Sequence, residues 1–273
     1  MLALLPGLLD AVHAARAARP GRVAETLLVP LYGLAALVLV KVGQGSLAWL
    51  AADRGMAVAM ATNDPTTVAA ATVPLAQALR CDDRPRYALE TALVAAHRLM
   101  PAAADGGPAG PAGAALLGTL LIQAALAAAE RGDEDGVRTL LDQAAELPRE
   151  SGAGDGGFGP AAVGAARVVA EAALGDVAAA AVRHEQLIAG ERWRWLPPEH
   201  RAAYLVDVAR AYARVDDMFP AGRALLLAER TAPGEVHDRP PVRTLVATVS
   251  RSPAAPPAFT RLTISSHRPP RSR

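Results

Sequence analysis

The stretch DVARAYARVDDMFPAGRALLLAERTAP, residues 207–233, decides the fold. Two apolar segments flank a short acidic break, and Ala209, Ala221 and Ala228 place small side chains at helical spacing along them. We expect an antiparallel helical hairpin, because small residues let two backbones approach closely while Tyr212 fills the space beside them. The proline that closes the stretch cannot continue a helix and therefore ends the second one.

The hairpin pattern recurs upstream at the same offsets, in three clear copies and a weaker one over 160–189. Its second-helix anchors stand at 48, 88, 137, about 180 and 221. Paired helices repeated at such intervals are typical of an α-solenoid. The sequence therefore predicts an all-α protein, a right-handed superhelix of helical hairpins. Helices are expected near 2–18, 22–42, 46–61, 65–80, 86–100, 113–131, 134–147, 160–174, 176–189, 198–214, 218–231 and 239–250.

The domain organisation follows from where helical periodicity stops. Residues 1–251 read as one helical-repeat domain, and 252–273 read as a disordered basic tail without helical period. The segment 27–40 is too short to span a membrane, and 108–129 begins in a Gly/Pro/Ala loop and contains Gln123. Both are predicted to be buried helices, and no membrane partner is expected.

Composition narrows the classes of function. Twenty-eight basic and 27 acidic residues give a net charge of +1, which provides no global field for nucleic acid or an anionic membrane. Aromatic residues make up only 4% of the chain. The single cysteine, Cys81, excludes an intrachain disulfide and fits a reducing cytosol. We therefore expect a cytoplasmic protein.

The small–aromatic–small–small–proline order of the last hairpin resembles the tetratricopeptide repeat (TPR). Other segments narrow the resemblance, and they occur in one order: GSLAWLAADRGMAVA (45–59), GFGPAAVGAARVVAEAALGD (157–176), LPPEHRAAYLVDVARAYARVDD (196–217) and ALLLAERTAPGEVHDRPPVRTLV (224–246). Together they are similar to the C-terminal TPR-like region of actinobacterial XRE-family transcriptional regulators. The resemblance implies a module that senses a signal or mediates assembly, next to a helix-turn-helix that binds DNA.

The chain departs from that family pattern ahead of the repeats. The stretch VGQGSLAWLAADRG at 42–55 imitates a helix-turn-helix, but its serine-to-glycine spacing is one residue short and it coincides with the first repeat. We therefore expect the effector half of such a regulator, truncated or encoded alone, with DNA contacts only through a separate or missing helix-turn-helix. The alternative is a stand-alone TPR scaffold that binds partner peptides or proteins.

A solenoid binds peptides or partner helices on its concave face, here the face of the first helix of each pair. Polar positions on those helices, and the tryptophans of the loop 190–198, are the candidate partner-binding residues. One of those indoles could equally anchor the loop on the core. Alanine-rich faces also allow a homodimer. The candidates are Gln77, Arg80, Gln123, Arg167, Trp193, Trp195, Asp207 and Arg210.

No motif indicates catalysis, so the prediction is a protein that is not an enzyme and uses no cofactor or metal. The glycine motif at 152–157 follows a predicted helix rather than a strand, which argues for a loop over a dinucleotide site. The six histidines show no i, i+4 pairing. The acidic turn at 133–136 lacks the other ligands of a calcium loop and reads as a helix cap.

Overall fold

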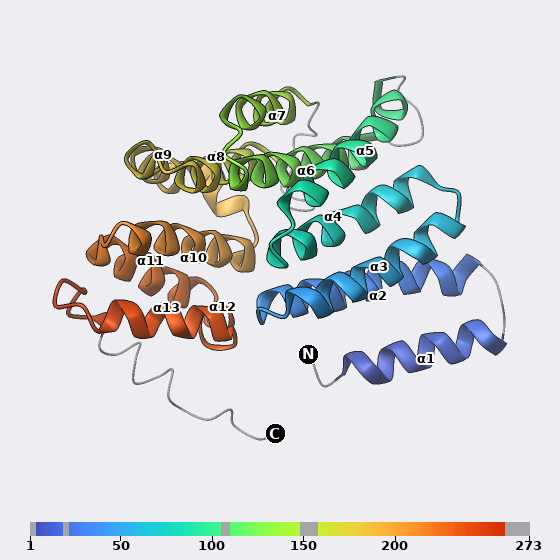
Figure 1. Cartoon of the computed structure of the whole chain (residues 1–273), viewed down its shortest axis with the longest axis horizontal. Helices are drawn as coiled ribbons and strands as arrows, with labels where there is room; N and C mark the ends of the chain where they lie inside the picture. The colour runs from blue at the N-terminus through green and yellow to red at the C-terminus, as the bar shows by residue number, and fades with distance from the viewer. Residues whose placement is uncertain (1–3, 19–21, 105–109, 148–157, 260–273) are drawn as a thin grey trace. The chain divides into compact units, whose positions relative to one another are not determined.

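A computed structural model describes residues 4–18, 22–104, 110–147 and 158–259. These residues form helices and connecting turns without any strand, as the alanine-rich periodic sequence predicts (Figure 1). The elements are α1 (Leu5–Ala18), α2 (Arg22–Lys41), α3 (Gly45–Ala61), α4 (Pro65–Cys81), α5 (Pro85–Ala104), α6 (Gly110–Glu130), α7 (Glu134–Glu146), α8 (Pro160–Leu174), α9 (Val177–Ala189), the 3-10 helix η1 (Glu191–Trp195), α10 (Pro198–Arg214), α11 (Met218–Thr231), α12 (Gly234–His237) and α13 (Pro240–Ser250).

Helix ends lie where the sequence places capping residues. Asp64 accepts hydrogen bonds from the backbone N–H groups of Thr66 and Thr67 at the start of α4. Asp133 caps α7 in the same way and Asp176 caps α9. Two short helices, η1 and α12, were not predicted, because neither is long enough to show a helical period.

The chain divides into two compact units, Met1–Gly159 and Pro160–Arg273, called unit 1 and unit 2 below. The sequence predicts a single domain over 1–251 instead. The sequence of the glycine-rich linker at 148–157 indicates a loop between repeats and not a boundary between domains. That linker lies outside the described residues.

One turn geometry recurs in five places along the described chain. In each, a residue at positive φ ends one helix, and the next N–H donates to the carbonyl five residues back over 2.8–3.0 Å. The donor–acceptor pairs are Gln44–Leu39, Arg84–Leu79, Asp133–Ala128, Asp176–Glu171 and Asp217–Tyr212, and the residues at positive φ are Gly43, Asp83, Gly132, Gly175 and Asp216. The turns therefore relate five helix pairs, with first helices α2, α4, α6, α8 and α10 and second helices α3, α5, α7, α9 and α11.

First helices of neighbouring pairs also pack on each other within each unit. In unit 1, α2 contacts α4 and α4 contacts α6, besides the contacts that each makes with its second helix. In unit 2, α8 contacts α10. The first helices thus form a continuous layer inside each unit, and this layer carries most of the predicted binding residues.

Unit 1 is held together by close contacts between consecutive turns. Gly45 begins α3 where an added Cβ would lie 2.8 Å from the carbonyl oxygen of Cys81, so the first turn rests directly on the end of α4. Ser46 donates to Asp82 over 2.7 Å beside this contact. In the middle of α2, the hydroxyl of buried Tyr32 lies 2.7 Å from Nε2 of His13 on α1. These contacts fix the register of the first helices.

Unit 2 has one large core, and it reaches beyond the predicted end of the domain. Phe259 is only 1% exposed and packs on Gly222 of α11, where an added Cβ would lie 3.4 Å from the ring. Pro256 sits 2.4 Å from the same Cβ position. The predicted tail boundary at 252 is therefore too early, because turns over 252–259 return this ring to the core. Residues 260–273 lie outside the described chain.

Candidate functional site

The shared turn gives every first helix a common numbering, counted back from the carbonyl that accepts the turn hydrogen bond. Gln123 and Asp207 both stand five residues before that carbonyl, and Gln77 and Arg210 both stand two residues before it. Four of the predicted binding residues therefore occupy two equivalent positions on one helix face. Arg80 and Arg167 occupy neither position.

The two positions differ in chemistry from helix to helix. At these two positions in unit 1, α2 carries two leucines, whereas α4 and α6 each carry one amide side chain. At the same two positions in unit 2, α8 carries two apolar residues and α10 carries an ion pair. Five residues before the acceptor stand Leu34, Pro74, Gln123, Ala166 and Asp207, and two residues before it stand Leu37, Gln77, Leu126, Val169 and Arg210.

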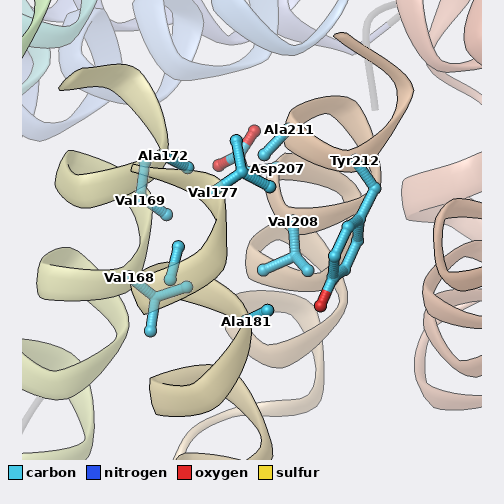
Figure 2. A pocket seen from close by; sticks show the side chains of 10 residues that line it. Val168, Val169, Ala172, Val177, Ala181, Asp207, Val208, Ala211 and Tyr212 are labelled. Carbon is cyan, nitrogen blue, oxygen red and sulfur yellow. The ribbon is translucent and has the colours of Figure 1, made fainter. Parts of the chain in front are cut away.

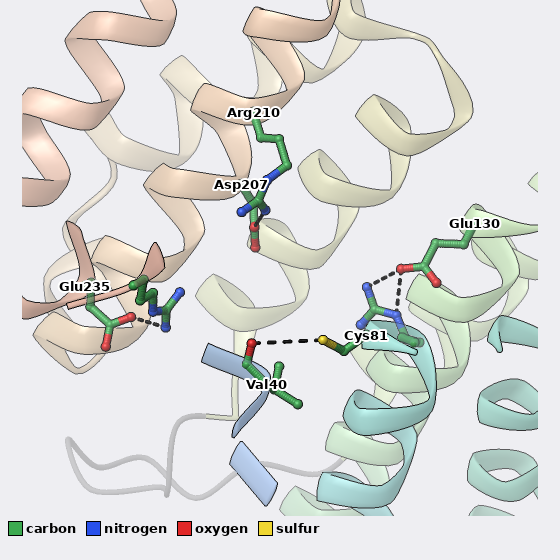
Figure 3. A network of polar contacts seen from close by, with 8 residues as sticks. Val40, Cys81, Glu130, Asp207, Arg210 and Glu235 are labelled. Atoms are coloured by element: carbon green, nitrogen blue, oxygen red, sulfur yellow. Dashed lines mark hydrogen bonds and ion pairs between the residues drawn. The ribbon is translucent and has the colours of Figure 1, made fainter. Parts of the chain in front are cut away.

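Three of the predicted residues of unit 1 lie together where α4 meets α6. Arg80 donates through Nε and Nη2 to the Glu130 carboxylate, at 2.9 and 2.7 Å, as the dashed lines to Glu130 in Figure 3 show. Its Nη1 lies 3.4 Å from Oε1 of Gln123. Gln77 stands three residues before Arg80 on α4 and is half-buried. Glu130 was not predicted, although it ends the same apolar helix.

Gln123 is buried, whereas the sequence predicts an outward-pointing residue. It is only 6% exposed, because α6 packs against α4, α5 and α7 at once. An uncharged amide tolerates this burial when a partner satisfies its oxygen, and Arg80 does so. Gln123 therefore lies beneath the binding surface rather than on it.

An apolar groove runs along the same layer between α2 and α4, with a volume of about 490 Å³. That volume falls within the range of ordinary ligand sites. The described residues that line the groove are all uncharged, and one of them, Leu34, is a large hydrophobic side chain at 39% exposure. The lining residues are Val29, Pro30, Gly33, Leu34, Leu37, Thr66, Thr67, Ala70, Val73 and Pro74.

Two prolines inside first helices face this groove, Pro30 in α2 and Pro74 in α4. Because proline has no N–H, the carbonyl of Ala70 lacks the donor that a helix normally supplies four residues later. Ala70 is exposed and lines the groove. The two prolines and Ala70 therefore all lie in the wall of the groove. Prolines inside two predicted helices were the sequence signal that could have pointed to it.

The corresponding positions on α10 in unit 2 carry an ion pair. Asp207 and Arg210 of α10 lie 2.6 Å apart, so each partly neutralises the other. Figure 2 shows the Asp207 carboxylate at the edge of a pocket whose other walls are apolar apart from Tyr212. The pocket has a volume of about 10 Å³, the space of one water molecule. It cannot hold a ligand side chain in this conformation.

A buried ion pair joins α12 to the start of α13. Glu235, which is almost fully buried, pairs with Arg239. Figure 3 marks this ion pair by the dashed line from Glu235. Burial lowers the pKa of Arg239, while the neighbouring Glu235 and Asp207 oppose that shift. Breaking one partner of such a pair leaves a buried charge uncompensated. The pair therefore ties α12 to the start of α13, and both of these helices contact α10.

The two tryptophans of η1 play different roles. Trp193 is buried with its ring 5.3 Å from that of Tyr204, and so anchors the loop on the core. The Tyr204 hydroxyl lies 2.8 Å from Nδ1 of His184, whose pKa burial lowers. Trp195 is 64% exposed. Only Trp195 is placed to contact a partner.

The remaining predicted features are the helix-turn-helix imitation, the glycine motif, the absence of a metal site and the single cysteine. The helix-turn-helix imitation at 42–55 is the turn after α2 with the first part of α3, where Ala48 and Ala52 are buried against the neighbouring helices. The glycine motif at 152–157 lies outside the described residues. The described residues hold no group of His, Cys, Asp and Glu side chains suited to a metal ion. Burial and Asp82 raise the pKa of the Cys81 thiol, which disfavours a reactive thiolate.

One helix is long and apolar enough to cross a membrane by length and composition, the stretch Ala112–Glu130 in α6, among the residues that the structure describes. Inside unit 1, 67% of this stretch is buried. Its apolar character is thus explained by its packing against α4, α5 and α7.

No known protein family matches the chain, and neither a curated protein nor a solved structure matches it.

Proposed function

We propose that the chain is a TPR-like helical-repeat module that binds a peptide or protein segment on the layer of its first helices. The observation that carries this proposal is the uncharged groove between α2 and α4, which lies on the same layer as the amide residues Gln77 and Gln123. Grooves between helices commonly receive apolar side chains, with a few polar groups fixing orientation. The repeated turn supports the repeat assignment, since it relates five helix pairs.

We further propose that this module serves as the sensory or interaction part of an XRE-type transcriptional regulator, with DNA bound by a separate helix-turn-helix. The family resemblance of the sequence supports this role. A stand-alone scaffold for protein complexes is the second candidate, and the same groove supports it equally. An in-frame helix-turn-helix coding stretch directly upstream would favour the regulator over the scaffold.

A random library of 12-residue phage-displayed peptides tests the binding proposal. Peptides selected on the full chain should lose at least tenfold in affinity for Leu34→Asp, which puts a charge into the groove. Val94→Asp is the control, since Val94 on α5 is exposed and lines a second groove of similar size, whose lining also includes His97 and Arg98. Failure to select any peptide that discriminates between the two variants would overturn the proposal.

Binding of a long promoter fragment at physiological salt tests the assignment of DNA contacts to another element. We expect no retention by this chain, because its charge is nearly balanced. Sequence-dependent retention would show that a DNA-reading element lies within these residues. Light scattering on the same sample reports whether the chain forms the homodimer that its small-residue faces allow.

A further inference from the structure

Three buried rings of unit 2 join α9, η1 and α10. Nδ1 of His184 on α9 lies 2.8 Å from the hydroxyl of Tyr204 on α10. The ring of Trp193 on η1 packs edge-on against Tyr204, with 5.3 Å between the ring centroids. His184 and Tyr204 are each 5% exposed, and Trp193 is 7% exposed. A histidine, whose charge changes within the range of about pH 5 to 8, therefore lies where three elements meet.

The η1 segment is held to unit 2 by few contacts. The N–H of Gly190 donates to Leu187, and the N–H of Trp193 donates back to Gly190, so these backbone bonds are local. Trp193 and Leu196 are the buried side chains of residues 190–196, and the other residues of this segment are exposed. A segment held by two side chains opens at a lower free energy than the helices of the core around it.

Protonation of His184 places a charge inside this cluster. A neutral imidazole can share one hydrogen bond with the Tyr204 hydroxyl, whereas an imidazolium also needs its charge stabilised. Burial lowers the pKa of His184, and Glu185 on the same helix opposes that shift only in part. The closed cluster therefore favours the neutral ring, and any state that brings water to the ring favours the charged one.

Among the described residues, α8, η1 and α10 supply no buried carboxylate that could hold the charge in place. Glu171 of α8 is bound to Arg183 over 2.8 Å. Asp207 of α10 is bound to Arg210 over 2.6 Å. The other titratable side chains of α8, η1 and the first turn of α10 either lie at the surface or carry the same sign as an imidazolium; they are Arg167, Glu191, Arg192, Arg194, Glu199, His200 and Arg201.

We infer that His184, Tyr204 and Trp193 form an acid-sensitive latch, in which protonation of His184 releases η1 while α9 and α10 stay folded. The released state hydrates the imidazolium and loses the contact between Trp193 and Tyr204. Trp195 belongs to the same segment, so a partner held through its exposed indole is bound at neutral pH and released in acid. The latch lies within unit 2 and does not depend on the groove of unit 1.

Hydrogen exchange of backbone N–H groups in the full chain, followed by NMR at pH 7.5 and pH 5, tests the latch. After correction for the intrinsic effect of pH on exchange, the protection of Trp193 and Leu196 should fall by up to about 30-fold at pH 5, because an exposed histidine titrates near 6.5. Both N–H groups should be less protected at either pH than that of Ala228, which is fully buried in α11.

Two variants identify the group that takes up the proton. His184→Asn cannot be protonated in this range, so the protection of η1 should not fall between pH 7.5 and pH 5. His200→Asn makes the same change at an exposed position of α10 and should keep the full fall. A fall of the same size in His184→Asn and in the original chain would assign the proton to another group and overturn the inference.

The original chain alone also decides the question, whatever the stability of the variants. Equal protection of η1 and of Ala228 would mean that the segment exchanges only when the whole unit unfolds, which overturns the latch. Protection of Trp193 and Leu196 that is the same at both pH values overturns it as well. A fall in η1 that starts from lower protection than that of Ala228 is the result expected of a local, proton-driven release.

Discussion

Replacing Phe259 with alanine tests the finding that the core of unit 2 extends past the last helix. The ring is 1% exposed and covers Gly222, so its removal exposes or empties the space between α11 and the turns at 252–259. Truncation of a fully buried phenylalanine costs about 3–5 kcal/mol. We therefore expect a loss of about 3 kcal/mol or more.

Urea unfolding of the full chain, followed by tryptophan fluorescence in a Trp49→Phe background, reports on unit 2. The remaining tryptophans, Trp193 and Trp195, both belong to that unit. With a slope of about 1–2 kcal/mol per molar urea, the midpoint should fall by roughly 2 M. Phe219→Ala is the matched control, since Phe219 on α11 is 50% exposed and should cost less than about 1 kcal/mol. Equal effects of the two substitutions would refute the reasoning.

Three further predictions concern pH and backbone geometry. Burial lowers the pKa of His184 in the folded chain below its ordinary value of about 6.5. Between these two values the unfolded chain binds one more proton than the folded chain, so the free energy of unfolding falls as the pH drops below about 6.5. The difference between the unfolding free energies at pH 5.5 and pH 8 should therefore be smaller for His184→Asn than for the original chain. An equal difference in the two proteins would contradict the prediction. Gly45→Ala should destabilise unit 1 by about 1–3 kcal/mol, because its Cβ meets the Cys81 carbonyl, whereas Gly7→Ala, with nothing within 4 Å, should be neutral or slightly stabilising. Urea unfolding of the full chain followed by far-UV circular dichroism measures both variants. Asp216→Gly should stabilise unit 2 by up to about 1 kcal/mol, because Asp216 adopts φ +60° and glycine carries no steric cost there; a loss of stability would show that its side chain supports the turn.

Most of the helical structure could be predicted from local signals. The helices 160–174, 198–214 and 218–231 were expected with the bounds that the structure has, because prolines, aspartates and the RVDD turn mark their ends. The burial of Phe259 could not be predicted in the same way. Its contact with Gly222 joins residues 37 positions apart, and nothing in the non-periodic stretch 252–259 announces it.

The candidate site was only partly predictable, for a related reason. Periodicity places Gln123 on the first-helix layer, but its depth depends on how many neighbours α6 acquires, which is a property of the packed unit. The groove between α2 and α4 requires two helices far apart in the sequence to meet at Gly33 and Pro74, where a Cβ added to the glycine would lie 3.3 Å from the proline ring. Such a meeting follows from the register of the turns, and the turns were predicted only as breaks between helices.

The recurring turn separates what keeps the chain folded from what the chain can recognise. Its hydrogen bond joins main-chain atoms only, from one N–H to the carbonyl five residues earlier, so it places no demand on the side chains two and five positions before that carbonyl. Leucine, glutamine, aspartate and arginine all occupy those positions here within the same frame. The residues two positions before the carbonyl are half-buried on all five helices, whereas Pro74, Gln123 and Ala166, five positions before it, are buried. Substitutions at the half-buried position can therefore alter ligand preference one helix at a time while the turns stay intact, so new specificities are open to this chain without a new fold.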